Sequence, residues 1–121
     1  MAGEPILVID DNATNLKLVR VLLTEEGYAV RTAAHAEEAL EVLAAFRPRV
    51  ILMDLQLPGM TGLELTRRLK ADPVHGRAKI LAVTAYAMKG DEQRALAAGC
   101  DGYVTKPIDL APLLAAIAAQ L

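Results

Sequence analysis

The sequence contains one cysteine, no tryptophan and few aromatic residues, which make up 3% of the chain. Because Cys100 is alone, no disulfide can form within the chain, and we expect a buried structural thiol. The shortage of aromatic rings leaves few surfaces on which nucleic acid bases could stack. No apolar run approaches the ~20 residues of a membrane span, and no basic-then-apolar leader opens the chain. These absences predict a soluble protein of the reducing cytoplasm.

Charge of one sign is not concentrated anywhere along the chain. Thirteen Lys and Arg residues face fifteen Asp and Glu residues, for a formal net charge of −2. A nucleic acid surface would need a concentrated basic patch, so we expect no direct binding of DNA or RNA, and none to membranes. The length of 121 residues and the 54% hydrophobic content predict one domain over residues 1–121, with no output domain attached.

Short apolar segments alternate with amphipathic ones along the whole sequence. The apolar segments predict strands at 5–9, 29–33, 50–54, 80–84 and 102–105. The amphipathic segments predict helices at 12–26, 37–46, 61–72, 91–98 and 109–121. This alternation indicates an α/β fold with a parallel sheet covered by helices on both faces. Arg31 and Thr32 place the second strand at an edge of that sheet.

Several residues mark where the predicted helices begin and end. Asn12 or Asp11 can cap the first helix, and Gly27 can end it. Thr61 and Glu64 have the spacing of a capping box for the third helix, and Asp109 can cap the last. The two histidines, His35 and His75, fall in predicted turns without a second ligand at metal spacing, so we expect both to be solvated.

Polar side chains follow four of the five predicted strands, at the point where each strand ends. Asp10 and Asp11 follow the first strand, and Asp54 ends the third. Thr84 ends the fourth strand, and Lys106 follows the fifth. Because the carboxyl ends of parallel strands share one edge of a sheet, these groups should converge on one pocket.

The predicted pocket has the chemistry of a metal-assisted phosphoryl acceptor. Three neighbouring carboxylates repel one another, and a divalent cation relieves that repulsion. Oxygen ligands favour a hard ion, so we expect Mg²⁺, with Mn²⁺ possible. Lys106 can neutralise a phosphoryl group and the Thr84 hydroxyl can donate to it. Asp54 is then a candidate nucleophile that would form an acyl phosphate.

Each of these residues also has a purely structural interpretation. Asp10 and Asp11 can cap a helix, Asp54 can form a turn, and Thr84 can be an ordinary strand residue. A lysine before a proline, such as Lys106, is usually solvated. The specific signal is their coincidence, with polar groups at four expected strand ends.

The motifs around these residues resemble the receiver domain of bacterial two-component response regulators. The matching segments are Ile9-Asp10-Asp11-Asn12, Leu52-Met53-Asp54-Leu55-Gln56-Leu57-Pro58-Gly59-Met60, Val83-Thr84-Ala85 and Tyr103-Val104-Thr105-Lys106-Pro107. The resemblance covers essentially the whole chain and is greatest to stand-alone cell-division receivers and to receivers of hybrid sensor kinases. It implies a flavodoxin-like (βα)5 fold whose strand order is 2-1-3-4-5.

The resemblance also implies a role for each acidic residue. Asp54 would accept a phosphoryl group from a phosphohistidine on a histidine kinase or a phosphotransfer protein. Asp11, Asp54 and the backbone carbonyl of Gln56 would bind Mg²⁺ directly, and Asp10 through water. The chain would thus be a phosphoacceptor rather than an enzyme, limited to self-catalysed phosphotransfer and autodephosphorylation.

Four further residues would bind the phosphoryl group or respond to it. Lys106, the Thr84 hydroxyl and the Ala85 amide would contact the phosphoryl oxygens. Tyr103 would rotate inward into space that Thr84 vacates, which changes the surface of the fourth helix, fifth strand and fifth helix. A downstream protein would read this surface, and we expect a monomer or weak dimer.

Other interpretations of the sequence are less consistent with these residues. A haloacid dehalogenase-type phosphatase needs a second Asp two residues after its nucleophile, where this chain has Gln56, and it needs room for a cap domain. A flavin or dinucleotide binder needs a phosphate-binding loop after the first strand. The intact acids, Thr84 and Lys106 argue against a degenerate receiver. A receiver excised from a hybrid kinase or a longer regulator is the main rival to a stand-alone protein.

Overall fold

The computed structural model describes residues 3–57, 59–84, 89–106 and 108–121. Within these ranges the chain forms a five-stranded parallel sheet of order β2-β1-β3-β4-β5. The strands are β1 (Pro5–Ile9), β2 (Ala29–Ala33), β3 (Val50–Asp54), β4 (Lys79–Thr84) and β5 (Gly102–Thr105). The predicted strand order and the parallel arrangement are confirmed.

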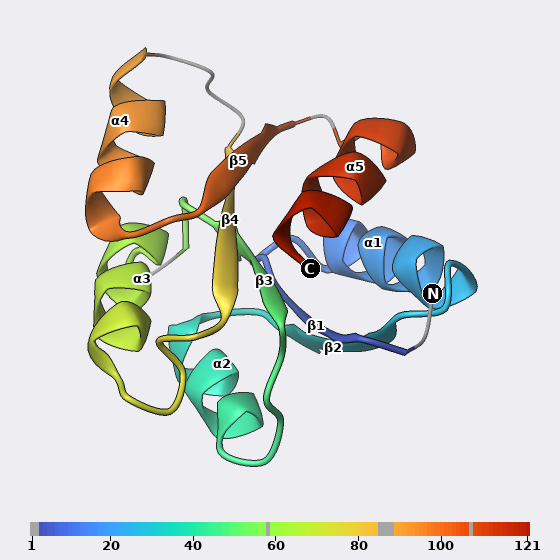
Figure 1. Ribbon diagram of the computed structural model, residues 1–121, viewed down its shortest axis with the longest axis horizontal. Helices are drawn as coiled ribbons and strands as arrows, with labels where there is room; N and C mark the ends of the chain where they lie inside the picture. Colours follow the sequence, from blue (N-terminus) through green and yellow to red (C-terminus); the bar gives the residue numbers. More distant parts are fainter. Residues whose placement is uncertain (1–2, 58, 85–88, 107) are drawn as a thin grey trace.

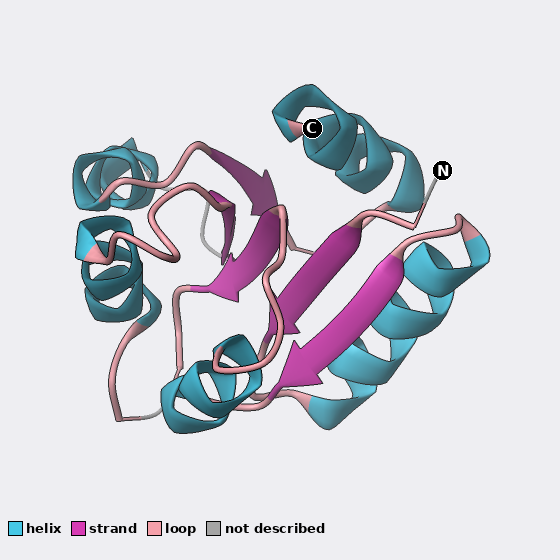
Figure 2. Ribbon diagram, turned by 60° about the horizontal axis from the view of Figure 1, so that its bottom comes forward, coloured by secondary structure: helices cyan, strands magenta, loops and turns pink. Residues whose placement is uncertain are grey.

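Helices cover both faces of this sheet (Figures 1 and 2). The described helices are α1 (Ala13–Glu25), α2 (Ala36–Leu43), α3 (Gly62–Ala71), α4 (Lys89–Ala98) and α5 (Leu110–Gln120). In Figure 1, α1 and α5 lie on one face, and α2, α3 and α4 lie on the other. The chain therefore has the flavodoxin-like (βα)5 fold.

The central strands are buried on both faces, which explains their continuous apolar sequences. In β3, Ile51 and Met53 pack with the side chains of α2 and α3. The alternate residues, Val50 and Leu52, pack with α1 and α5 on the opposite face. All five residues of β3 are buried, including Asp54 at its end. The strand thus anchors an ionisable group in the buried centre of the sheet.

Within the described part of the chain, the outer strand β2 pairs with β1 alone and is partly exposed, as its sequence predicts. Its Arg31 guanidinium carbon lies 5.7 Å from the centre of the Phe46 ring, a cation–π contact. None of the described helices has the length and apolar character that crossing a membrane requires. Cys100 is buried, as predicted, and burial raises the pKa of its thiol, which favours the unreactive protonated form.

The beginnings of three helices sharpen or correct the predictions. Asn12, rather than Asp11, caps α1 by accepting from the Asn15 backbone N–H at 3.0 Å. His35 is exposed, as predicted, and its Nδ1 also accepts from the Glu38 N–H and caps α2. Asp109 occupies the cap position of α5 without a side-chain cap hydrogen bond. Pro112, the third residue of that helix, has no N–H to donate.

Two helix ends test the predicted boundaries. Gly27 follows α1 with a φ of 93°, the left-handed conformation that ends a helix, as predicted. The second helix ends at Leu43, three residues before the predicted Phe46. Beyond Leu43 the turn tightens, because the Ala45 N–H donates to the Val42 carbonyl three residues earlier at 3.1 Å instead of continuing the α-helical pattern.

Candidate functional site

The register of the sheet brings the predicted polar residues to one edge. Ile9 of β1 lies beside Met53 of β3, so Asp10 and Asp54 follow neighbouring positions. Asp54 in turn lies beside Val83, the residue before Thr84. Thr84 pairs with Thr105, and Lys106 follows directly, with its backbone N–H donating to the Thr84 carbonyl at 2.7 Å. The convergence expected from sequence is therefore a consequence of strand register.

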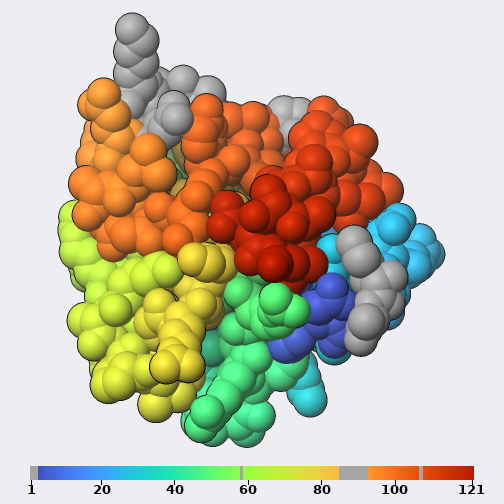
Figure 3. Space-filling model, in the orientation of Figure 1, coloured from blue at the N-terminus to red at the C-terminus, as the bar shows by residue number. Residues whose placement is uncertain are grey.

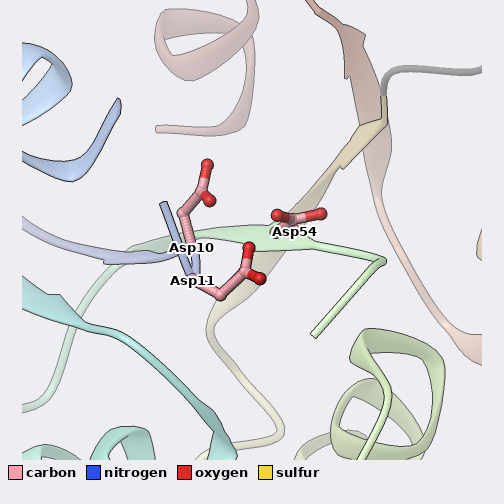
Figure 4. Close-up of side chains that lie close together, drawn as sticks. All are labelled: Asp10, Asp11 and Asp54. Atoms are coloured by element: carbon pink, nitrogen blue, oxygen red, sulfur yellow. The ribbon is translucent and has the colours of Figure 1, made fainter. Parts of the chain in front are cut away.

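Three carboxylates gather at this edge, as Figure 4 shows. Asp10 and Asp11 come from the end of β1, and Asp54 from the end of β3. One ligand oxygen from each residue lies within 4.8 Å of the others. Asp10 and Asp54 are buried, whereas Asp11 is exposed. We call Asp10, Asp11 and Asp54 the acidic cluster. Two of its members are thus buried, and the third faces solvent.

Each buried aspartate uses one oxygen to hold its own loop. Asp10 Oδ1 accepts from the Asn12 backbone N–H, and Asp54 Oδ1 accepts from the Gln56 N–H, both at 2.9 Å. The second oxygens face Lys106, whose Nζ lies 3.2 Å from Asp54 Oδ2 and 3.3 Å from Asp10 Oδ2. Both side chains are therefore fixed by backbone donors while sharing one ammonium group.

One lysine does not compensate for this concentration of negative charge. Burial raises the pKa of Asp54, and the neighbouring Asp10 raises it further, against the Gln56 N–H and Lys106, which lower it. Burial alone would lower the pKa of Lys106, but its hydrogen bond and charge contacts with Asp54 and Asp10 raise it. The site therefore holds its lysine charged and leaves carboxylate charge that an added cation would neutralise.

The donor set of the acidic cluster fits a hard divalent ion. All three ligands are carboxylate oxygens. Two oxygens bound to one Mg²⁺ lie at most about 4.2 Å apart, and the three carboxylates each place an oxygen within 4.8 Å of the others, close to that limit. The exposed position of Asp11 leaves room for the waters that Mg²⁺ retains. The residues present are thus suited to Mg²⁺ or Mn²⁺.

The remaining predicted residues occupy different positions around the cluster. Thr84 is buried at the end of β4 and borders a cavity of about 190 Å³ together with Gln56 and Arg94. Ala85 lies outside the described residues. Tyr103 does not join the acids: it lies in β5, is 40% exposed and lines a separate groove against α5.

One residue of the site was not predicted from sequence. Gly62, the first residue of α3, lies against the backbone of β3's last residue. A Cβ atom at Gly62 would overlap the Asp54 carbonyl oxygen and come within 2.8 Å of Leu55 Cα. The missing side chain therefore lets α3 start directly beneath the loop that carries Asp54. The only sequence signal is a glycine placed immediately after the capping residue Thr61.

Comparison with known proteins identifies the family. The family model described as "Response regulator receiver domain" matches residues 6–118. The polar-differentiation response regulator DivK of Brucella anthropi is 40% identical over 118 residues, which cover 98% of this chain and 96% of that protein. DivK of Brucella ovis is similar to the same extent.

Solved structures lead to the same family. The Vibrio cholerae chemotaxis protein CheY4 superposes with a TM-score of 0.94 at 30% identity, covering 99% of this chain and all of that one. The receiver domain of a Pseudomonas aeruginosa sensor histidine kinase, solved with magnesium in its active site cleft, gives a TM-score of 0.89 at 34% identity with 98% of each chain covered. The chain belongs to the receiver domain family of two-component response regulators.

Proposed function

We propose that Asp54 accepts a phosphoryl group from the phosphohistidine of a histidine kinase or a phosphotransfer protein. A carboxylate oxygen of Asp54 would attack phosphorus as the phosphorus–nitrogen bond of the donor breaks, leaving an acyl phosphate. The observation that carries this proposal is the position of Asp54 beside two other carboxylates and the Lys106 ammonium group. Asp54 belongs to a cluster of three carboxylates and its Oδ2 lies 3.2 Å from Lys106 Nζ.

The acidic cluster is proposed to bind Mg²⁺, the ion present in the Pseudomonas receiver domain. Asp11 and Asp54 would be direct ligands together with the Gln56 carbonyl, and Asp10 would act through water. The bound ion would supply charge for the incoming phosphoryl oxygens. The backbone hydrogen bonds to Asp10 Oδ1 and Asp54 Oδ1 support this assignment, since they fix both carboxylates before any ligand arrives.

Lys106 is proposed to hold the phosphoryl group once it has transferred. Its Nζ is already at the second oxygens of Asp10 and Asp54, so a phosphoryl group on Asp54 would form beside a fixed positive charge. The Thr84 hydroxyl and the Ala85 amide would donate to the remaining oxygens. Chemistry would be limited to this transfer and to slow hydrolysis of the product.

The output is proposed to be a change in the surface formed by α4, β5 and α5. Tyr103 is exposed in β5, and Leu96 is 50% exposed in α4, a helix that contacts β5. Movement of Thr84 toward the phosphoryl group would leave space into which Tyr103 could turn. A coupling of about 1–3 kcal/mol would change the affinity for a downstream protein five- to 150-fold.

Labelling with acetyl phosphate in the presence of Mg²⁺ tests the acceptor. We expect one phosphoryl group per chain that is stable in acid and lost in base, and no labelling of Asp54→Asn or after chelation of Mg²⁺. The matched control is Asp101→Asn, which makes the same change at a distant carboxylate. Labelling that persists in Asp54→Asn, or disappears equally in both variants, contradicts the assignment of Asp54.

A further inference from the structure

A second polar site lies at the opposite edge of the sheet from the acidic cluster. The loop before β3, the loop before β4 and the C-terminal end of α5 adjoin on the face shown in Figure 3, in green, yellow and red. Between them is an open groove of about 420 Å³, a volume typical of small-molecule sites. We call it the basic groove; its lining residues include Arg47, Arg49, His75, Arg77 and Lys79.

The basic groove carries four permanent positive charges and, among the described residues that line it, no carboxylate side chain. Arg47 and Arg77 are exposed and form no hydrogen bond or ion pair with any described residue. Among the described residues, the Arg49 guanidinium donates a single long hydrogen bond, of 3.5 Å, to the Leu121 backbone oxygen. Lys79 is 3.9 Å from an oxygen of Asp101, whose other oxygen is bound to Lys70 at 2.8 Å. Most of the donor capacity of the groove is therefore unused.

The positive charge of the basic groove is opposite in sign to the net charge of the chain. The four cations carry +4 on a protein of formal net charge −2, so the remainder carries −6. The charges come from two chain segments, 47–49 and 77–79, brought together because Val50 and Lys79 are partners in the β3–β4 register. A concave surface of one sign focuses the field and attracts ligands of the opposite sign.

We propose that the basic groove binds an oligophosphate: a ligand with two or more linked phosphate groups, such as a nucleoside triphosphate. Guanidinium groups bind phosphate oxygens in a paired, two-point geometry, and two unpaired arginines at one groove can hold adjacent phosphates. An extended nucleic acid would need a basic stripe and aromatic stacking surfaces, whereas these charges are confined to one groove without a Phe, Tyr or Trp in its lining.

Equilibrium binding of inorganic triphosphate, ATP and AMP tests the proposal. The buffer must be free of divalent metal, because a metal ion could link triphosphate to the acidic cluster at the other edge. We expect triphosphate and ATP to bind comparably and AMP at least about tenfold more weakly, because recognition rests on linked phosphates. The double variant Arg47→Glu, Arg77→Glu should raise the dissociation constant of triphosphate about 100-fold or more.

The control is Arg20→Glu combined with Arg67→Glu, which changes the net charge equally at two exposed positions on α1 and α3. It should leave triphosphate binding within about threefold, because salt screens distant surface charges. Both double variants should still be labelled by acetyl phosphate, which verifies folding.

The proposal is overturned if wild-type protein does not bind triphosphate at millimolar concentration or if both double variants lose binding equally. Binding of ATP but not triphosphate overturns it too, as does tighter binding of a poly-glutamate peptide, which would indicate an acidic protein partner.

Discussion

Two lysine–aspartate pairs sit at opposite edges of the same sheet, and their electrostatics differ. Lys70 and Asp101 form a 2.8 Å pair at the edge where β4 begins, and Lys106 and Asp54 form a 3.2 Å pair at the edge where β3 ends. Burial opposes ionisation of both aspartates, but only the pKa of Asp101 is lowered overall, whereas that of Asp54 is raised. Similar contacts with a lysine therefore accompany opposite shifts in the pKa of the two aspartates.

The difference lies in the groups around each pair. Asp101 Oδ2 also accepts from the Ile80 backbone N–H at 2.8 Å, and Lys70 donates to the Ala78 carbonyl at 2.9 Å, so both partners are satisfied. Asp54 is more deeply buried and has Asp10 as a like-charged neighbour that shares its lysine. The first pair stabilises the fold. The second holds a carboxylate in an unfavourable state that a metal ion can relieve.

The largest effect should come from disturbing the backbone at the acidic edge. Gly62→Ala places a Cβ against the Asp54 carbonyl and Leu55, so α3 and the loop must move apart. Because a shift of ~1 Å can reduce a rate about 100-fold, we expect a loss of that order in acetyl phosphate labelling. The measurement is the initial labelling rate at saturating Mg²⁺.

Gly59→Ala is the control for Gly62→Ala. Gly59 has a φ of 73° but open space around its Cβ position, so alanine there costs backbone strain without a clash. We expect a loss of about 1 kcal/mol in the free energy of unfolding and a labelling rate close to wild type. If both glycine variants slow labelling equally, then α3 does not position Asp54 through close contact.

Much of the fold and the site could be predicted from sequence because the signals were local or followed from parallel topology. Buried strands and the residues directly after them can be read along the chain, and topology then places Asp10, Asp54 and Lys106 at one edge. Gly62 escaped prediction because its importance depends on the distance between α3 and β3, which no periodicity records. The capping role of His35 escaped because histidine is an uncommon cap.

The basic groove escaped sequence analysis for a related reason. Its charges are separated by about thirty positions, so neither segment forms a block of like charge, and the total composition is slightly acidic. Only the pairing of β3 with β4 brings Arg49 and Lys79 together. The residues that follow strands could be grouped because the carboxyl ends of parallel strands share one edge of the sheet. The loops that precede strands have no comparable pattern of polar residues in this sequence.

A smaller effect should come from removing Lys106, the lysine that pairs with Asp54. Lys106→Met removes a positive charge that lies beside the proposed metal ligands and repels a divalent ion. We expect Mg²⁺ to bind more tightly, by a factor on the order of ten, since one charge contact at effective dielectric constants near the surface is worth a few kcal/mol at most. Titration calorimetry with MgCl₂ measures this change.

Lys70→Met is the matched substitution at the opposite edge. It removes an equal charge from the Lys70–Asp101 pair, far from the acidic cluster, and should leave the Mg²⁺ affinity within about twofold of wild type. Weaker Mg²⁺ binding by Lys106→Met would mean that the lysine helps assemble the cluster rather than competing with the ion.

The smallest effects, but opposite in sign, should come from neutralising each aspartate in metal-free buffer. The folded-state pKa of Asp101 is lowered, so its contribution to stability is present above the unfolded value near 3.8 and is lost as pH falls through the folded pKa. The folded-state pKa of Asp54 is raised, so ionisation of this group costs stability once pH rises above 3.8 and through the folded pKa. At pH 7 we therefore expect Asp101→Asn to lower the free energy of unfolding by about 1 kcal/mol and Asp54→Asn to raise it by about as much.

Urea denaturation at pH 7 and pH 3 measures both changes in the free energy of unfolding, and each difference from wild type should shrink at pH 3. Destabilisation of similar size in both variants at pH 7 would show that the two pairs are equivalent, and that Asp54 is held by its hydrogen bonds rather than strained by its charge.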